Sequence, residues 1–238
     1  MSSTYLSLTN ELLRRLNEVE LDSTNFAASR NVQALAKDSI NSSVRELLHS
    51  AQEWPFTLVT YLQTLTVGEA TYSFPATLNS VDWQSFYLKK LNDSNEPGNL
   101  EVISYTQYIE EYRGKDESSG TGGYGPPRIV SQTKENKFIV SPPPNLAYVI
   151  EYKYWSFPTS LSLFSDVCVI PERFNNVIID GAMMFMMLFR SNEQSASIHK
   201  DKFEQGVKTM RRLLMDEPLS VRSAMLTRPT LSTRVMNG

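Results

Sequence analysis

The segment Val177–Phe189, VIIDGAMMFMMLF, constrains the fold more than any other part of the sequence. As a helix it is apolar on nearly every side, because methionines line the face opposite its main stripe, so other elements must cover it. It is shorter than the roughly 20 residues that a membrane-spanning helix needs, and it contains Asp180. We therefore predict a buried core helix that begins near Pro171, a residue type favoured in a first turn. Its predicted stripe consists of Phe174, Val177, Ile178, Ala182, Phe185, Leu188 and Phe189.

Three further helices are predicted from apolar residues at three- and four-residue steps. The first spans Asn10–Val19 with Thr9 as its N-cap. The second spans Asn31–Glu53 and is stopped by the proline that follows Trp54. The third spans Ile198–Met215 near the end of the chain.

The middle of the chain, Phe56–Cys168, has the character of β-strands, being rich in Thr, Val and Tyr. A hairpin is predicted with its turn at Lys134–Lys137, and a short helix at Thr106–Arg113. The polar, glycine-rich stretch Gly114–Pro127 is predicted to be a mobile loop. One strand alternates cleanly. The residues predicted to share its first face are Tyr148, Ile150, Tyr152 and Tyr154.

The order helices, strands, helices predicts an α+β fold with a discontinuous helical bundle, because neither pair of helices buries its stripes alone. We assign residues 1–55 and 171–217 to that bundle, built from the N- and C-terminal helices. Residues 56–170 are assigned to an inserted antiparallel β domain, and residues 218–238 to an extended C-terminal docking arm.

Catalytic and cofactor chemistry find no support in the sequence. Residues 120–125, GTGGYG, match a dinucleotide-binding string, but no strand precedes them and Pro126 follows where a helix must begin. A single cysteine, Cys168, and two histidines, His49 and His199, exclude cysteine-based and three-histidine metal sites. His199 and Asp201 do not face each other on a helix. We predict that the protein is not an enzyme and uses no cofactor.

The C-terminal arm differs in charge from the rest of the chain. The whole chain carries −3 and the arm carries +3, so the remainder carries −6. That acidic balance is unlike the basic footprint of a dedicated nucleic-acid binder. The arginines lie six residues apart, which places them on one side of an extended strand. Either the arm is an ordinary disordered terminus or it docks on a partner; we favour docking. The predicted docking residues are Leu219, Arg222, Met225, Leu226, Arg228, Leu231 and Arg234.

Three segments resemble the head-to-tail adaptor proteins of tailed bacteriophages, also called tail tubular protein A in short-tailed phages. Two are SLTNELLRRLNEVEL and QALAKDSINSSVRELLHSAQEWPF, near the N-terminus. The third, YKYWSFPTSLSLFSDVCVIPERFNNVIIDGAMMFMMLFR, is similar to the family's approach to its C-terminal helices, where a Trp and Pro stretch leads to Pro-Glu-Arg-Phe. The likeness covers most of the chain and is weakest over residues 92–145.

This resemblance implies a structural protein of the virion neck that assembles in the host cytoplasm as a dodecameric ring under the portal protein. It implies an arm that inserts against the portal, and a β domain facing a downstream tail or nozzle protein and possible tail fibres. Double-stranded DNA then passes through the lumen without specific binding, and no membrane is involved; the sequence shows no export signal. Two alternatives remain: another neck or tail-completion (stopper) ring protein, and a non-viral cytosolic β-domain binding module.

Overall fold

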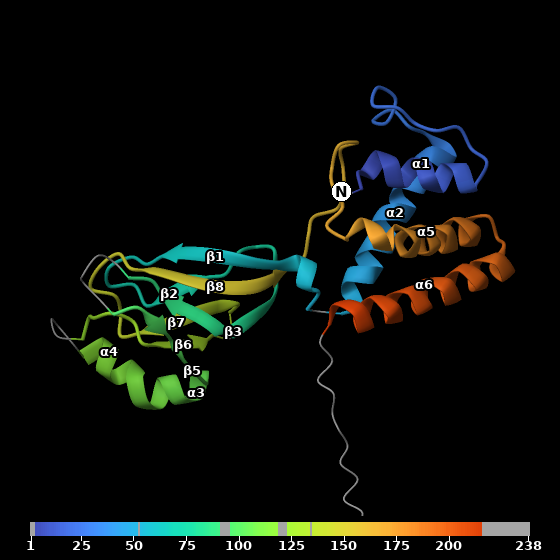
Figure 1. The fold of residues 1–238 in the computed structure, drawn as a ribbon. Helices are drawn as coiled ribbons and strands as arrows, with labels where there is room; N and C mark the ends of the chain where they lie inside the picture. The colour runs from blue at the N-terminus through green and yellow to red at the C-terminus, as the bar shows by residue number, and fades with distance from the viewer. Residues whose placement is uncertain (1–2, 52, 91–95, 119–122, 134, 216–238) are drawn as a thin grey trace, which may run out of the picture.

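The computed structural model describes residues 3–51, 53–90, 96–118, 123–133 and 135–215. Four long helices from the two ends of the chain lie together at one end of the molecule, and the strands lie at the other end (Figure 1). Mixed helix and sheet in separate regions confirm the α+β class. Among the described residues, no helix is long and apolar enough to cross a membrane. The long helices are α1 (Tyr5–Arg15), α2 (Asn31–His49), α5 (Asn175–Phe189) and α6 (Glu193–Leu214).

The predicted bounds of α1 were wrong at both ends. Thr4, not Thr9, is the N-cap, and its side chain accepts a hydrogen bond from the Ser7 amide at 3.2 Å. Thr9 lies inside the helix, where its hydroxyl donates to the Tyr5 carbonyl at 2.8 Å. Asn17 stops the helix because it adopts φ 57°, the left-handed conformation of a residue just past a helix end.

The other long helices each deviate mainly at one end. α2 ends at His49 rather than Glu53, and a short 3₁₀ helix, η1 (Pro55–Thr57), follows. Another 3₁₀ turn, η3 (Glu172–Phe174), precedes α5. α6 begins five residues earlier than predicted because the Asn192 side chain accepts from the Ser195 amide at 3.1 Å and caps it.

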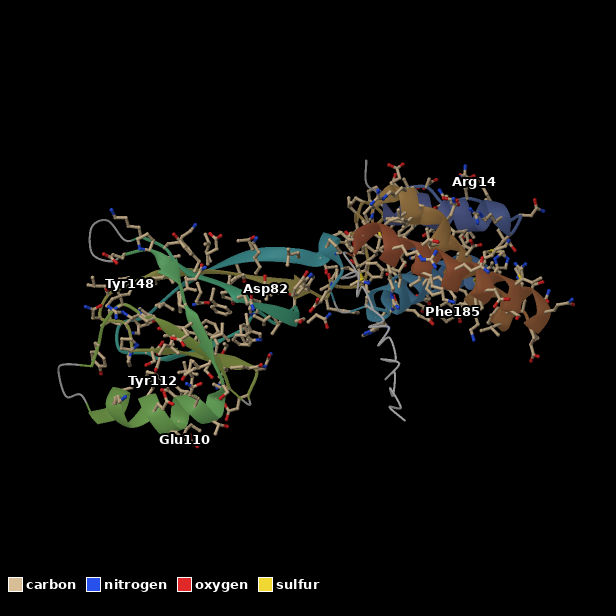
Figure 2. The ribbon with its side chains drawn as sticks, turned by 60° about the horizontal axis from the view of Figure 1, so that its bottom comes forward. Arg14, Asp82, Glu110, Tyr112, Tyr148 and Phe185 are labelled. Atoms are coloured by element: carbon tan, nitrogen blue, oxygen red, sulfur yellow. The ribbon has the colours of Figure 1, made fainter. Side chains whose placement is uncertain are left out.

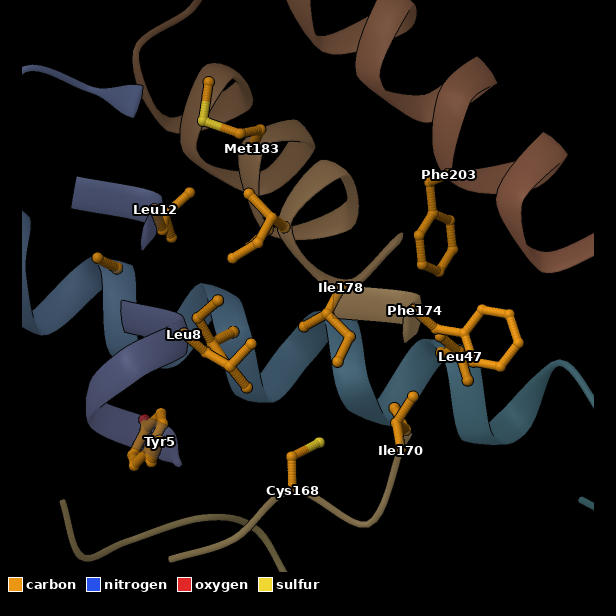
Figure 3. Packing of buried hydrophobic residues seen from close by; sticks show 14 of the residues in the cluster. Tyr5, Leu8, Leu12, Leu47, Cys168, Ile170, Phe174, Ile178, Met183 and Phe203 are labelled. Carbon is orange, nitrogen blue, oxygen red and sulfur yellow. The ribbon is translucent and has the colours of Figure 1, made fainter. Parts of the chain in front are cut away.

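α5 is the central helix of this group, in contact with α1, α2 and α6. Its neighbours come close because it carries a glycine at the crossing point. A Cβ on Gly181 would collide with the Ser43 hydroxyl of α2 and would stand 2.8 Å from a ring carbon of Phe203 on α6. The Ser43 hydroxyl donates to the Ile178 carbonyl at 2.7 Å, so the close approach also satisfies a buried polar group. Figure 3 shows Ile178 and Phe203 between these helices.

The predicted stripe of α5 is buried at its first half but not at its end. Ile178 and Ala182 are fully buried, whereas Leu188 is 52% exposed and Phe189 is 66% exposed. The prediction was wrong for these last two residues, which lie on the exposed side of the last turn of the helix. Met183, Met184 and Met186 are buried on its other faces, as the all-round apolar pattern predicted.

The strands form two four-stranded sheets, in the orders β1-β8-β3-β4 and β2-β7-β6-β5. The predicted hairpin with its turn at Lys134–Lys137 is confirmed, since β6 and β7 pair antiparallel on either side of that turn. The eight strands of the two sheets are β1 (Leu58–Thr64), β2 (Thr71–Ser73), β3 (Leu78–Leu88), β4 (Gly98–Asn99), β5 (Glu101–Ile103), β6 (Ile129–Gln132), β7 (Lys137–Ser141) and β8 (Val149–Ser156).

Aromatic rings fill the space between the two sheets. Phe86 and Tyr152 stack at 4.8 Å between centroids, and Phe138 of the opposite sheet packs edge-on against both at 5.4 and 5.7 Å. Such pairs contribute beyond the area they bury. The prediction that one set of residues in and just before β8 shares a face is confirmed. This face points inward, and its residues are at most 5% exposed: Tyr148, Ile150, Tyr152 and Tyr154.

Two details of the strand region differ from prediction. β5 and β6 run parallel, so the region is not purely antiparallel. The predicted short helix is longer: α3 (Tyr105–Tyr108) continues through a π-helical turn (Ile109–Arg113) into α4 (Gly114–Ser118). The expected mobile loop was therefore wrong for Gly114–Ser118. Tyr108 anchors the helix on the outer side of the second sheet, against Ile129 and Ile139.

The two largest clusters of buried side chains correspond to the two regions. The helical cluster contains residues from both ends of the chain, from Tyr5 to Met210, and the strand cluster runs from Leu65 to Tyr154. The division at residues 55 and 170 stays a prediction, as does the arm at 218–238, which lies outside the described residues.

We predict that Gly181→Ala lowers the free energy of unfolding by about 1–3 kcal/mol, the usual effect of overpacking a close helix contact. The added methyl group meets Ser43 and Phe203, both of which are buried. Thermal unfolding followed by circular dichroism measures the change.

Gly114→Ala is the matched control, because that glycine is also helical and nothing lies within 4 Å of the position that a Cβ would take there. It should leave stability unchanged or raise it by about 0.5–1 kcal/mol. Equal effects of the two substitutions would contradict the packing role assigned to Gly181.

Candidate assembly surfaces

Within the part of the chain that the structure describes, no group of three or more His, Cys, Asp or Glu side chains is placed to hold a metal ion. Cys168 is buried, and burial raises the pKa of its thiol, which disfavours the reactive thiolate. It packs as a small apolar residue beside Ile170 (Figure 3).

The dinucleotide-like string at 120–125 falls partly outside the described residues, which resume at Gly123. Gly125 donates its amide to the Pro143 carbonyl at 2.9 Å, and the chain continues into strand β6 at Ile129. A dinucleotide site needs a helix to begin at this point, so that its amides meet the phosphates. The segment is instead a connection into a strand.

A polar cluster that the sequence did not predict joins three helices. The His199 ring of α6 lies 3.1 Å from the Asp180 carboxylate of α5, and Arg15 of α1 approaches the same oxygen at 3.9 Å. Arg15 also donates to the Asn176 amide oxygen at 2.8 Å. The expectation that His199 and Asp201 do not pair was right, but the true partner lies on another helix. His199 and Arg15 both interact with the Asp180 carboxylate, so the cluster holds three helices together and leaves no free base at the surface among these residues.

The far end of α5 presents a small apolar surface. Leu188 and Phe189 lie there, and Val19, just past α1, is 77% exposed. An ion pair between Arg190 and Glu18 at 3.0 Å holds the ends of α5 and α1 together. We call the exposed group Val19, Leu188 and Phe189 the distal apolar surface.

The near end of α5 is preceded by an irregular segment, residues 157–170, which we call the junction loop. Three of its apolar side chains point outward: Leu163 is 62% exposed, Phe164 42% and Val167 56%. Exposed apolar residues gathered on one loop mark an interaction surface more often than a single exposed leucine does.

The junction loop is held in a defined shape. Asn41 of α2 pairs with both backbone groups of Leu161, at 2.9 and 3.0 Å. Asp166 accepts from the amides of Ser162 and Leu163 at 2.7 and 2.8 Å, and these bonds hold the pKa of its carboxyl below its usual range. The loop also pairs with α1, where the Tyr5 amide donates to the Asp166 carbonyl at 2.8 Å.

A groove of about 400 Å³ separates the junction loop from α2. Apolar side chains of Val44, Leu48 and Phe157 line it, and Arg45 reaches across it to the Ser160 hydroxyl at 3.1 Å. Figure 2 shows the side chains in two groups, with Arg14 and Phe185 at the helical end of the molecule and Tyr112 and Tyr148 at the strand end. The charged residues of its lining, Arg45 and Asp166, are bonded to Ser160 and to the amides of Ser162 and Leu163, so the groove suits a side chain of a partner protein better than a reacting substrate.

The residues predicted for portal docking lie outside the described residues, from Leu219 to Arg234. The junction loop and the distal apolar surface were missed by sequence reasoning. The sequence contains one indication of the exposed loop. Leu163, Phe164 and Val167 occur among serines in a segment without helical or strand periodicity.

A family of adaptor proteins, the SU10 adaptor protein family, matches residues 3–226. The chain belongs to the SU10 adaptor protein family. It is a family of structural adaptors of bacteriophages, not a known class of enzyme, and it places the protein in the virion neck. A search of curated proteins finds no match. The match spans all four long helices, both sheets and the first part of the arm, as far as Leu226.

We predict that Asp166→Ala loosens the junction loop without unfolding the protein. The amides of Ser162 and Leu163 lose their acceptor and should exchange faster with solvent, as hydrogen exchange with mass spectrometry or NMR would detect. Because the pKa of Asp166 is lowered, this stabilisation is present above the ordinary aspartate range and is lost as the pH falls through the lowered value.

Ser165→Ala serves as the control, since Ser165 is an exposed neighbour on the same loop. It should leave the exchange of both amides unchanged. If Asp166→Ala also leaves them unchanged, the carboxylate does not shape the loop.

Proposed function

We propose that this protein is the head-to-tail adaptor that docks under the portal of its phage, extends the DNA channel and connects capsid to tail. The family match over residues 3–226 carries this proposal, because it spans the helices, the strands and the start of the arm together. The more specific likeness to tail tubular protein A, stated from the N-terminal and junction segments, belongs to the same proposal.

The proposed assembly is a closed ring of twelve copies. A ring needs two different surfaces on each copy, because every copy meets one neighbour on each side. The junction loop and the distal apolar surface are two such surfaces, on either side of α5, a helix about 22 Å long. They are exposed in the single chain and apolar, which favours their burial between neighbours.

The arm is proposed to bind the portal. Three arginines without an acidic neighbour pair with portal carboxylates, and the apolar residues between them act as anchors. The proposed contacts are Leu219, Arg222, Met225, Leu226, Arg228, Leu231 and Arg234.

Charge supports a channel through which DNA slides. Without the arm the chain carries −6, and an acidic lining repels phosphate where a basic lining would retain it. Double-stranded DNA thus passes without specific binding. The strand region is proposed to face the next tail or nozzle protein and possible fibres.

We predict that deleting residues 219–238 leaves the fold intact and reduces portal binding by at least about a hundredfold, the loss of several anchored contacts. The four long helices and both sheets are complete by Leu214, so the deletion leaves every residue of these elements in place. Binding to purified portal is measured by biolayer interferometry, and folding by circular dichroism.

A charge-matched control separates the arm from general electrostatics. Replacing Arg222, Arg228 and Arg234 by alanine should weaken portal binding, whereas replacing three exposed lysines of α6 should not. Those lysines are Lys200, Lys202 and Lys208. Portal binding by the truncated chain equal to that of the full chain would refute the arm's role. A ring that binds the lower face of another neck protein and not the portal would favour the stopper alternative.

A further inference from the structure

β1 is a long open edge. It is the outer strand of its sheet and, within the described residues, pairs with β8 along one side only. The other outer strands, β2, β4 and β5, are two or three residues long, whereas β1 has seven. A long edge strand presents a row of unpaired backbone groups to any extended segment nearby.

The register shows which groups of β1 face outward. The Leu65 amide donates to the Tyr148 carbonyl at 2.8 Å, which makes these two a hydrogen-bonded pair. Because bonded and non-bonded pairs alternate in an antiparallel ladder, Tyr61 and Gln63 also direct their backbone groups toward β8. The residues between them therefore direct theirs away from the sheet.

Two of the outward residues have no backbone partner. The Leu58 amide bonds to the Pro55 carbonyl, and the Gln63 side chain donates to the Thr64 carbonyl at 3.1 Å. For Thr60 and Leu62, by contrast, neither the N–H nor the C=O meets a partner among the residues that the structure describes.

β1 also lacks the features that usually protect an edge. Its sequence, LVTYLQT, has no charged residue and no proline. Leu58 is 40% exposed and Leu62 53%, on the same face of the strand. An uncharged edge with exposed leucines promotes aggregation unless another segment covers it.

The chain itself supplies a covering segment at this place. α6 ends beside η1, which leads directly into β1 (Figure 1). Phe56 of η1, Leu214 and Met215 all pack against the helical hydrophobic cluster. Because α6 ends near η1, the residues that follow Met215 begin near the first residues of β1.

The first part of the arm has the composition of a strand that fits this edge. Residues Leu219–Leu226, LSVRSAML, contain neither proline nor acidic residues, and Pro229 follows soon after. Their length is close to that of β1, and the family match ends at Leu226. Leu219, Val221 and Met225 share one face of an extended strand.

We propose that residues 219–226 add to the outer edge of β1 of the same chain as a parallel strand while the chain is free. The Thr60 and Leu62 backbone groups receive partners, and the apolar face of the segment covers Leu58 and Leu62. This inference concerns the unassembled chain and is separate from the portal docking proposed above. On docking, the segment would leave β1 and bind the portal in the extended form that it already has.

The test is amide exchange by NMR on the free chain, without portal. In the full chain the Thr60 and Leu62 amides should exchange at least about tenfold more slowly than in the chain that lacks residues 219–238. The Tyr61 and Gln63 amides, bonded to β8, should be equal in the two proteins and serve as internal controls.

Proline variants locate the covering segment, since proline cannot donate to a ladder. Val221→Pro with Met225→Pro should reproduce the deletion, whereas Ser232→Pro with Val235→Pro should not. Equal exchange of Thr60 and Leu62 with and without the arm overturns the proposal. Protection that grows with protein concentration also overturns it, because the segment would then come from another copy.

Discussion

The contact of α5 with α2 and α6 at Gly181 is the constraint on which the helical region depends. α2 lies near the start of the chain and α6 near its end. Both pack against α5 at Gly181, where a larger side chain would prevent their close approach. Ser43, Ile178 and Phe203 meet at that point, so the two halves of the chain are joined by packing rather than by sequence proximity. The strands are thereby held between two connections, one at Pro55 and one through the junction loop.

This arrangement leaves the surfaces proposed for assembly at the ends of α5 and at the edge of a sheet. The junction loop is fixed by Asn41 and by the Asp166 carboxylate, so its exposed apolar side chains are presented in a defined position. The distal apolar surface lies at the other end of the same helix. A rigid helix between two apolar surfaces is suited to repeated contacts around a ring, where each copy must hold its neighbours at a fixed angle.

Several features of the fold could be predicted because a local residue pattern determines them. The alternation around Tyr152 predicted which residues share a face of β8, and the all-round apolar character of α5 predicted its burial. Helix ends were missed where a local hydrogen bond competes with periodicity, as at Thr4 and at Asn17. The pairing of Asp180 with His199 was not predictable, because it joins two helices whose relative rotation is set by tertiary packing. The exposure of Phe189 was missed for the same reason: apolar periodicity does not show where the neighbouring helices end.

The most direct test of the adaptor assignment is cryo-electron microscopy of the purified chain mixed with the portal protein of the same phage. The account predicts a ring of this protein on the portal, with the helical region toward the portal and the strand region away from it. A free monomer before mixing is compatible with that result, since the portal can template the ring. Chains that stay monomeric and bare portals in the presence of excess protein would contradict the account.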